Sequence, residues 1–199
     1  RPPINTELFK PRDKALARKI LGLPINKRII GYVGDIDEKR GFNIVAKLAT
    51  TLNDDTKLLI TSVNIDYISK NTVKNFTRAI RKGTVLFIPR KISIWHVYNA
   101  IDALLLPMYD DYSTEPPVTL LEALSSGTPV IGGLSPSMYD YRGLYLAVNV
   151  YEWHEIPSLI NDSVLLSEYG EKAREYMVRN HSYNIIAEEL RKFLPWTAT

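Results

Sequence analysis

A carboxylate and a short basic loop are the groups of this sequence best placed to bind a charged ligand. Glu122 lies one to two turns into a predicted helix that starts after Pro116 and Pro117 and ends before Gly127. The helix follows a polar loop at the carboxyl end of a short apolar strand. Parallel sheets bind ligands at that edge, against helix N-termini that favour anions. Residues 98–133 therefore predict an anion site beside Glu122.

The basic loop follows the first predicted strand. Gly34 and Gly41 let backbone amides come close to a ligand, and the cations Lys39 and Arg40 suit a phosphate. The loop has neither the G-x-G-x-x-G dinucleotide pattern nor the P-loop pattern, so neither of those phosphate cradles is predicted. A tight strand-to-helix turn with incidental charges is the alternative interpretation.

Metal chemistry has little support in the sequence. Asp35 and Asp37 form a D-x-D pattern, with which some enzymes hold a divalent cation and a diphosphate, but three letters are weak evidence. His96, His154 and His181 are far apart, and none has the i, i+4 partner of a helical zinc pair. The sequence contains no cysteine and no G-x-S-x-G pattern for a serine nucleophile. We therefore expect neither a metal nor a cofactor.

The elements that position these groups alternate between strand and helix. Short apolar runs predict six strands, at residues 27–34, 57–63, 84–89, 103–107, 128–133 and 143–148. The predicted helices lie at residues 11–22, 42–52, 65–83, 93–100, 118–127, 155–180 and 182–194. The alternation predicts an α/β fold with a doubly wound, Rossmann-like parallel sheet and a helical tail over residues 150–199. Without a linker or a repeat, residues 1–199 are predicted to form one domain.

Composition narrows the function classes. The chain has 199 residues, of which 45% are hydrophobic, as expected of a globular domain. A net charge of +3 is too small to indicate nucleic-acid binding. No run approaches the roughly 18 apolar residues that span a bilayer, and no signal-peptide pattern opens the chain. The lack of cysteine fits an intracellular protein, and we expect a cytoplasmic location.

Basic residues concentrate on one predicted helix. Residues 67–101 hold seven Lys or Arg and no acid. The basic positions that recur at helical spacing are Lys70, Lys74, Arg78 and the pair Arg81 and Lys82. The apolar positions roughly opposite are Ile65, Ile68, Phe76 and Ile80. A solvated helix face is one interpretation, because charged residues usually stay exposed. Contact with anionic lipid at the inner face of the membrane is the other.

A family resemblance appears in residues 98–133. The run PPVTLLEALSSGTPVI, preceded by AIDALLLP, resembles the donor-binding carboxyl-terminal domain of GT-B glycosyltransferases, in particular the large retaining group 4 family (group 1 glycosyl transferases). Residues 2–11 resemble the lead-in to that domain, residues 29–42 resemble its first strand and glycine loop, and the tail resembles its closing helices. The resemblance covers nearly the whole chain, and the 98–133 pattern is its most specific part.

The resemblance implies a site for a nucleoside-diphosphate sugar donor. Arg40, helped by Lys39, matches one of two basic positions that neutralise the diphosphate, whereas Asp35 stands where the family has arginine. A carboxylate there would repel a diphosphate by roughly 1 kcal/mol or more. Glu122 matches the glutamate that binds the ribose hydroxyls. The backbone N–H groups that would face the phosphates are those of Val118, Thr119 and Leu120.

Further site positions follow from the same resemblance. Glu115, or Thr114 at the matching position, would meet the transferred sugar, and Glu115 with Arg40 forms the expected catalytic set. Arg90 and Ile92 lie in the loop that contacts the nucleobase in the family, with an ordinary strand exit as the alternative. The family needs no metal, so the resemblance implies metal-independent, retaining transfer to an unknown acceptor.

The resemblance also implies a second domain. The chain starts at Arg1 rather than Met, and residues 2–11 resemble an interdomain lead-in, so we expect an acceptor-binding domain upstream. The chain alone is expected to bind a donor without transferring its sugar. The alternatives are a GT-B nucleotide-sugar epimerase and a non-enzymatic flavodoxin-like binding module, because a fold does not fix a function.

Overall fold

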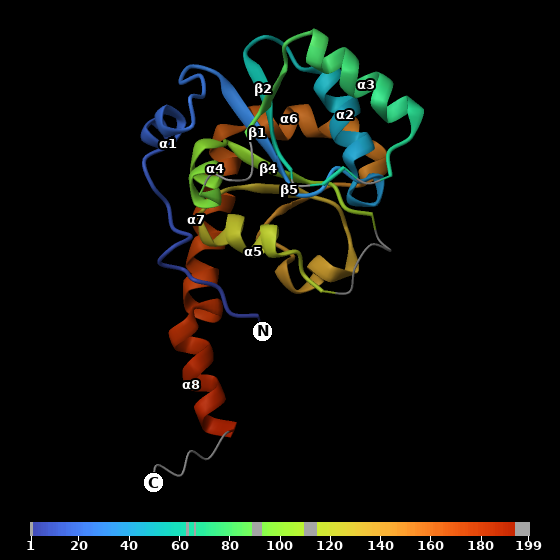
Figure 1. The fold of residues 1–199 in the computed structure, drawn as a ribbon. Helices are drawn as coiled ribbons and strands as arrows, with labels where there is room; N and C mark the ends of the chain where they lie inside the picture. Colours follow the sequence, from blue (N-terminus) through green and yellow to red (C-terminus); the bar gives the residue numbers. More distant parts are fainter. Residues whose placement is uncertain (1, 63, 66, 89–92, 110–114, 194–199) are drawn as a thin grey trace.

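The centre of the structure is a parallel sheet of six strands. The computed structural model describes residues 2–62, 64, 65, 67–88, 93–109 and 115–193. The strand order is β3-β2-β1-β4-β5-β6, and each strand runs parallel to its neighbours (Figure 1). The strands are β1 (Arg28–Val33), β2 (Thr56–Thr61), β3 (Val85–Phe87), β4 (Ala103–Leu106), β5 (Val130–Gly132) and β6 (Leu146–Ala147). The predicted doubly wound, Rossmann-like sheet is confirmed.

Helices cover both faces of the sheet. The α-helices are α1 (Lys14–Ile20), α2 (Phe42–Thr51), α3 (Lys70–Arg81), α4 (Ile94–Ala100), α5 (Val118–Ser125), α6 (Ile156–Asn161), α7 (Ser163–His181) and α8 (Tyr183–Phe193). Three short 3-10 helices are η1 (Glu38–Arg40), η2 (Pro136–Tyr141) and η3 (Val150–Glu155). Helices α1, α4, α5 and α7 pack on one face, and α2, α3 and α6 on the other. The predicted helical tail is present, and α8 extends away from the sheet (Figure 1).

The two-sided cover explains why the strands are apolar throughout. Side chains of a strand point alternately to its two faces. In β1, Ile29 and Val33 pack with α4 and α5, whereas Ile30 and Tyr32 pack with α2. All four are buried, so neither face of this strand requires polar residues. Each such burial stabilises the fold by about 1.5–3 kcal/mol.

Helix α3 begins later than the sequence pattern suggested. The prediction placed its start near residue 65, but the helix begins at Lys70. The side chain of Ser69 accepts a hydrogen bond from the Thr72 N–H and so caps the helix. Ile65 lies before the cap and forms an isolated parallel bridge with Ile36.

The apolar side predicted for α3 is only partly buried. Phe76 packs edge-on against Phe42, with ring centroids 5.0 Å apart. In contrast, Ile65 is 71% exposed and Ile80 is 46% exposed. The apolar positions named from the sequence are therefore not buried alike, because the helix is shorter than predicted and lies at the edge of the fold.

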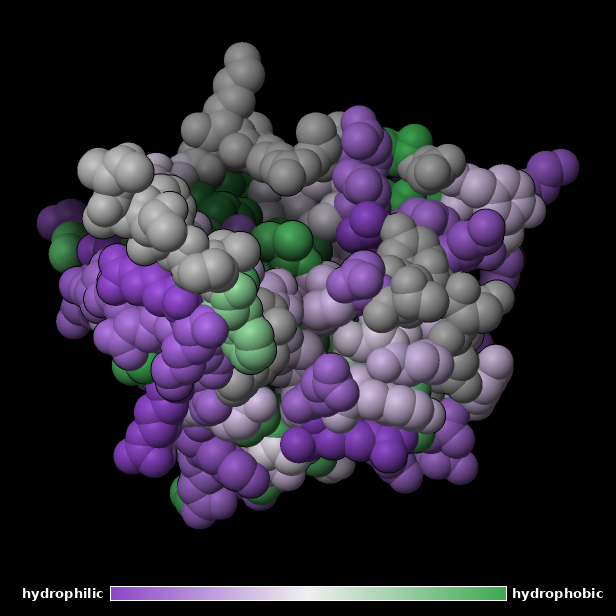
Figure 2. All heavy atoms as spheres, turned by 90° about the horizontal axis from the view of Figure 1, so that it is seen from below, coloured by the Kyte–Doolittle hydropathy of each residue, from purple (hydrophilic) through white to green (hydrophobic). Residues whose placement is uncertain are grey.

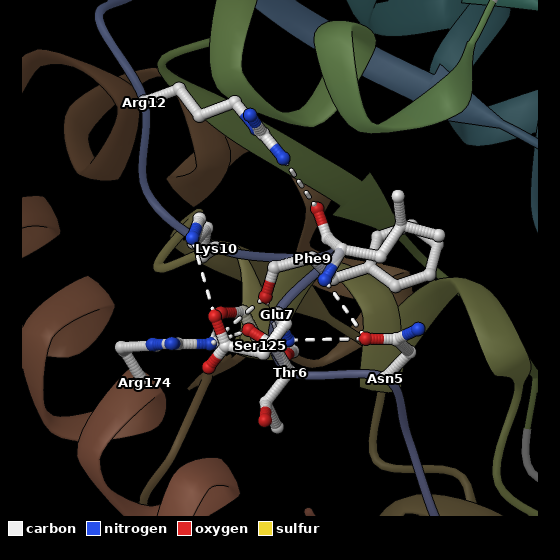
Figure 3. A network of polar contacts seen from close by, with 9 residues as sticks. Asn5, Thr6, Glu7, Phe9, Lys10, Arg12, Ser125 and Arg174 are labelled. Atoms are coloured by element: carbon white, nitrogen blue, oxygen red, sulfur yellow. Dashed lines mark hydrogen bonds and ion pairs between the residues drawn. The ribbon is translucent and has the colours of Figure 1, made fainter.

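The N-terminal segment is tied to α5 and α7. Arg174 of α7 donates through Nη1 to the carbonyls of Thr6 at 2.8 Å, Phe9 at 2.9 Å and Ser125 at 2.9 Å (Figure 3). Ser125 of α5 also donates from Oγ to the Phe9 carbonyl at 2.8 Å. Burial lowers the pKa of Arg174, and the nearby carboxylate of Glu7 partly opposes that shift. A single guanidinium thus holds three segments that are distant in sequence.

One face of the molecule is largely polar. The face seen in Figure 2 is mainly hydrophilic, and its hydrophobic side chains form small separate patches, as is usual for surfaces that face water. Within the part of the chain that the structure describes, no helix is long and apolar enough to cross a membrane.

Candidate functional site

A cavity of about 480 Å³ lies at the carboxyl edge of the sheet. It opens beside the ends of β1 and β4, where the strand order changes direction. Doubly wound sheets bind ligands at this topological switch point. We call it the switch-point cavity, and it is lined by Val33, Gly34, Asp35, Arg40, Thr61, Ile94, Met108, Glu115, Pro116, Pro117, Val118, Thr119 and Glu122.

Two glycines shape the loop that brings Arg40 to the cavity. Gly34 has a φ of 138°, and a Cβ there would lie 3.3 Å from Nη1 of Arg40. Gly41 has a φ of 77°, and a Cβ there would lie 1.9 Å from the carbonyl oxygen of Pro107. A side chain at either position is therefore disfavoured by backbone conformation, and at Gly41 also by a direct clash. The glycines let η1 pack against the end of β4, which places Arg40 at the cavity.

Arg40 forms an ion pair inside the cavity lining. Its Nη2 lies 3.7 Å from Oδ2 of Asp35, and the two side chains are 29% and 31% exposed. Tyr32 fixes the backbone of this loop, because its hydroxyl donates to the Asp35 carbonyl at 2.6 Å. The sequence predicted repulsion between Asp35 and an anionic ligand. In the structure, the Asp35 carboxylate also neutralises part of the positive charge of Arg40, which would otherwise attract an anionic ligand.

The N-terminus of α5 forms another part of the lining. Val118 and Thr119, its first two residues, line the cavity, and their N–H groups have no carbonyl partner within the helix. The N–H of Leu120 donates to the Pro117 carbonyl at 2.9 Å, and its side chain is buried. The predicted helix end therefore lines the cavity. Val118 and Thr119 contribute to the lining, and Leu120 does not.

Glu122 lies one turn further along α5 and also lines the cavity. The hydroxyl of Tyr98, from α4, donates to Oε2 of Glu122 at 2.7 Å. Tyr98 is itself buried, so this hydrogen bond fixes the orientation of the carboxylate. Glu115 lies at the exposed rim of the same cavity. The arrangement combines a guanidinium, a helix N-terminus and three carboxylates, those of Asp35, Glu115 and Glu122.

The remaining predicted positions fall outside this group. Lys39 is exposed and is not among the described lining residues. Arg90, Ile92 and Thr114 lie outside the residues that the structure describes, so their predicted roles stay predictions.

Four lining residues, Val33, Thr61, Ile94 and Met108, were not found from the sequence. Thr61 ends β2, is 3% exposed, and its hydroxyl has no hydrogen-bond partner among the described residues. Ile94 begins α4, and Met108 follows β4. The rule that ligands bind at the carboxyl ends of parallel strands could have identified Thr61 and Met108.

The D-x-D pattern does not form a pair of free carboxylates. Asp37 caps η1, since its Oδ1 accepts a hydrogen bond from the Lys39 N–H at 2.9 Å. Asp35 instead faces Arg40. Over the described residues, no group of three or more His, Cys, Asp or Glu side chains is placed to hold a metal ion.

A larger cavity, of about 540 Å³, lies at the opposite edge of the sheet. Its lining includes Arg28 at the start of β1 and Asp102 just before β4. Asp102 accepts hydrogen bonds there from Lys14 and from the Ile29 N–H. Burial disfavours the charge of Asp102, but these hydrogen bonds outweigh that effect and lower its pKa. Because ligands of parallel sheets bind at the carboxyl ends of the strands, we assign the functional site to the switch-point cavity.

Fold and site together define a Rossmann-like domain with a cavity at its switch point. The sequence profile described as "Glycosyl transferases group 1" matches residues 13–180. The chain belongs to this family of glycosyltransferases, and its fold is that of the carboxyl-terminal domain of GT-B enzymes. The resemblance stated from the sequence is thereby confirmed.

The individual relatives share little sequence identity with this chain. The D-inositol 3-phosphate glycosyltransferase of Mycobacteroides abscessus is 27% identical over 150 residues, which cover 71% of this chain and 33% of that protein. The carboxyl-terminal domain of a glycosyl transferase group 1 family protein (LpcC) from Francisella tularensis superposes with a TM-score of 0.72 at 15% identity, over 90% of this chain and 99% of that one. Anabaena HepE, solved with UDP and glucose, gives a TM-score of 0.76 at 16% identity, over 98% and 55%. The chain thus spans about a third of the curated relative it matches.

Proposed function

We propose that this chain is the donor-binding domain of a glycosyltransferase and binds a nucleoside-diphosphate sugar in the switch-point cavity. The observation that carries the proposal is that Arg40, the α5 N-terminus and Glu122 line one cavity. A guanidinium and free backbone N–H groups suit a diphosphate. A carboxylate one turn away suits the two hydroxyls of a ribose. The relative solved with UDP and glucose supports this class of ligand.

The proposed chemistry is transfer of the sugar without a metal and with retention of configuration. The departing diphosphate accumulates negative charge, which Arg40 and the N–H groups of Val118 and Thr119 would stabilise. Glu122 would hold the ribose in the orientation set by Tyr98. Glu115, at the rim of the cavity, would meet the sugar. The anomeric configuration of the product, measured by NMR, tests retention.

The proposal is tested by titration calorimetry with UDP, GDP and ADP, with and without EDTA, and with flavin mononucleotide as a competing ligand. We expect one nucleoside diphosphate to bind, with an affinity that EDTA does not change, and flavin not to bind. Arg40→Ala should abolish most of the binding. A requirement for magnesium or manganese would contradict metal independence, and preferred binding of flavin would favour a flavodoxin-like module instead.

We also propose that the complete enzyme needs a separate acceptor-binding domain, while residues 1–199 form the donor domain. Transfer depends on closure around two substrates, and their orientation alone can supply about 7–11 kcal/mol. The chain alone should therefore bind donor and transfer no sugar, although slow hydrolysis of the donor is compatible with the site. Mass spectrometry of mixtures with candidate acceptors tests this, and efficient transfer by the chain would contradict it.

A contact between α3 and anionic membranes is a further part of the proposal, with the protein in the cytoplasm. Lys70, Lys74 and Arg78 are exposed on α3, whose surface also carries the exposed Ile80. Lys82 does not support the contact, because its Nζ donates to the Leu52 carbonyl at 2.6 Å. Basic residues near an anionic surface contribute about 1 kcal/mol each.

Sedimentation with vesicles of phosphatidylserine and phosphatidylcholine tests the membrane contact. We expect binding that salt weakens and that the double variant Lys74→Glu, Arg78→Glu abolishes. Equal binding of this variant, or equal binding to vesicles of phosphatidylcholine alone, would contradict the proposal. Cell fractionation of the full protein tests its location.

A further inference from the structure

A further hollow, separate from the switch-point cavity, lies over the first half of α2. Its volume is about 190 Å³, and we call it the α2 groove. Asn43 and Lys47 of α2 line it, together with Asn71, Thr72 and Asn75 of α3 and with Tyr109, Tyr151 and Trp153. The turn η1 connects the two hollows: Arg40 lines the switch-point cavity, and Glu38 bonds to Thr72 of the groove.

The chemistry of the groove is neutral and amphipathic. Asn71 and Asn75 each present an amide that can both donate and accept hydrogen bonds, and the phenols of Tyr109 and Tyr151 can do the same. Asn43 also lines the groove, but its Oδ1 is buried. Among the described residues that line the groove, Lys47 alone is charged. This set does not suit a phosphate, which would require more cations, and it is too polar for an aliphatic ligand.

The aromatic residues add apolar faces beside the amides. Tyr109 and Tyr151 lie with ring centroids 6.1 Å apart, and Trp153 packs against the core while Lys47 Nζ lies 5.6 Å from its ring centroid. Tyr151 is 76% exposed, an unusual position for a large aromatic side chain. A ligand with hydroxyl groups around its edge and C–H groups on its faces would match both kinds of surface.

Hydrogen bonds hold these groups in place before any ligand binds. Asn43 Nδ2 donates to the Tyr109 hydroxyl at 2.7 Å, which fixes the direction of that phenol. The carboxylate of Glu38 accepts from the Ser69 N–H at 2.9 Å and from the Thr72 hydroxyl, which ties α3 to η1. Burial opposes the charge of Glu38, but these hydrogen bonds outweigh it and lower its pKa. Preorganised groups lose less entropy when they bind.

We propose that the α2 groove binds a neutral pyranose unit of a carbohydrate, at a site distinct from the donor cavity. A groove of about 190 Å³ is smaller than the roughly 300–1,000 Å³ of pockets for drug-sized ligands. Its volume therefore limits the ligand to about one sugar ring. Such a site would hold a carbohydrate chain on the domain while chemistry takes place elsewhere. It does not depend on the identity of the nucleotide in the switch-point cavity.

The test is a ¹H–¹⁵N NMR titration of the chain with the methyl glycosides of glucose, mannose and galactose, in turn. UDP is present to occupy the switch-point cavity, and each titration is repeated without UDP. We expect at least one glycoside to shift the Trp153 indole N–H and the side-chain amides of Asn43 and Asn75 in a saturable way. Trp153→Phe identifies the indole signal.

Variants then separate the groove from the rest of the surface. Tyr151→Ala and Asn75→Ala should each weaken the glycoside at least about fivefold, the loss expected for one good contact or hydrogen bond. Tyr183→Ala, which removes an exposed tyrosine from α8, serves as the control and should leave the affinity unchanged. All three variants should bind UDP as the unchanged chain does.

The results of these titrations test the proposed sugar site in the α2 groove independently of the proposed donor site. The proposal is wrong if none of the three glycosides produces a saturable shift at Trp153, or if Tyr151→Ala and Asn75→Ala bind as tightly as Tyr183→Ala. Failure of UDP, GDP and ADP alike to bind would contradict the proposed function. The glycoside titration without UDP would then still decide the proposal for the groove.

Discussion

Asp35 and Arg40 face each other across the lining of the switch-point cavity, with Oδ2 and Nη2 3.7 Å apart. Arg40 is the cation best placed for a diphosphate, so a ligand there must compete with the Asp35 carboxylate for the guanidinium. The pair is about two-thirds buried, and its attraction is stronger than that of a fully exposed pair. Asp35 therefore neutralises part of the charge that Arg40 would present to an anionic ligand.

Asp35→Asn should tighten nucleoside-diphosphate binding about fivefold or more. The variant removes a repulsion of about 1 kcal/mol and ends the ion pair between Asp35 and Arg40. Titration calorimetry with the nucleotide that binds best gives the change. Asp140→Asn is the control, since it makes the same charge change at an exposed position of η2. Equal or weaker binding by Asp35→Asn would show that Asp35 does not oppose the ligand.

Tyr98→Phe should weaken the same ligand about three- to tenfold. The hydroxyl donates to Glu122 at 2.7 Å, and its loss leaves the carboxylate less well oriented for a ribose. Glu122→Ala should cost about 1.5–3 kcal/mol, since it removes the charged hydrogen-bonding group itself. Tyr145→Phe removes a buried hydroxyl that donates to the Gly133 carbonyl, away from the cavity, and should not change the affinity. If Tyr98→Phe behaves like Tyr145→Phe, Tyr98 has only a structural role.

The fold was predictable because its strands and turns have local signals. The strands of this sheet are apolar on both faces, and Gly22, Gly83 and Gly127 follow helices with positive φ, as helix ends favour. The start of α3 was misplaced because the apolar spacing continues through Ile65 and Ile68 into extended chain. The Ser69 cap, three residues before Thr72, was the local signal that defines the true start.

The site was predictable only in part, because local sequence patterns do not show which side chains from different elements come into contact. Gly34, Arg40 and Glu122 were found since each lies beside the carboxyl end of a strand, where ligands bind. The hydrogen bond between Tyr98 and Glu122 joins α4 to α5, and no local pattern encodes it. Lys39 was expected beside Arg40 at the site, but it is exposed and Arg40 lines the cavity without it.

Arg174→Met should lower the free energy of unfolding by about 2–4 kcal/mol. Methionine retains the length and the apolar stem but leaves the carbonyls of Thr6, Phe9 and Ser125 without their shared donor. Urea denaturation followed by circular dichroism measures the change. Arg179→Met, on the same helix, is the control: its partner Glu175 is exposed, and the expected effect is within about 0.5 kcal/mol. Equal midpoints for the two variants would mean that the N-terminal segment contributes little to stability.

Asp102→Asn should destabilise the chain at neutral pH and not at low pH. Asp102 accepts hydrogen bonds at 2.7 Å from Lys14, from the buried Arg18 and from the Ile29 N–H, and its pKa is below its ordinary value. A lowered pKa in the folded state stabilises the fold above the unfolded pKa of about 3.9, and this contribution is lost as the pH falls through the folded value.

The difference in unfolding free energy between the unchanged chain and Asp102→Asn should therefore stay constant from about pH 5 to pH 8, at about 1.5–3 kcal/mol, the usual worth of hydrogen bonds to a charged group. It should shrink below about pH 4, where the carboxylate becomes protonated. Asp54→Asn, at an exposed position 3.9 Å from Lys57, should show no comparable loss at any pH. Urea titrations at three pH values give both curves. A difference for Asp102→Asn that persists undiminished at the lowest pH would mean that the charge of Asp102 does not contribute, and that the amide fails for steric reasons instead.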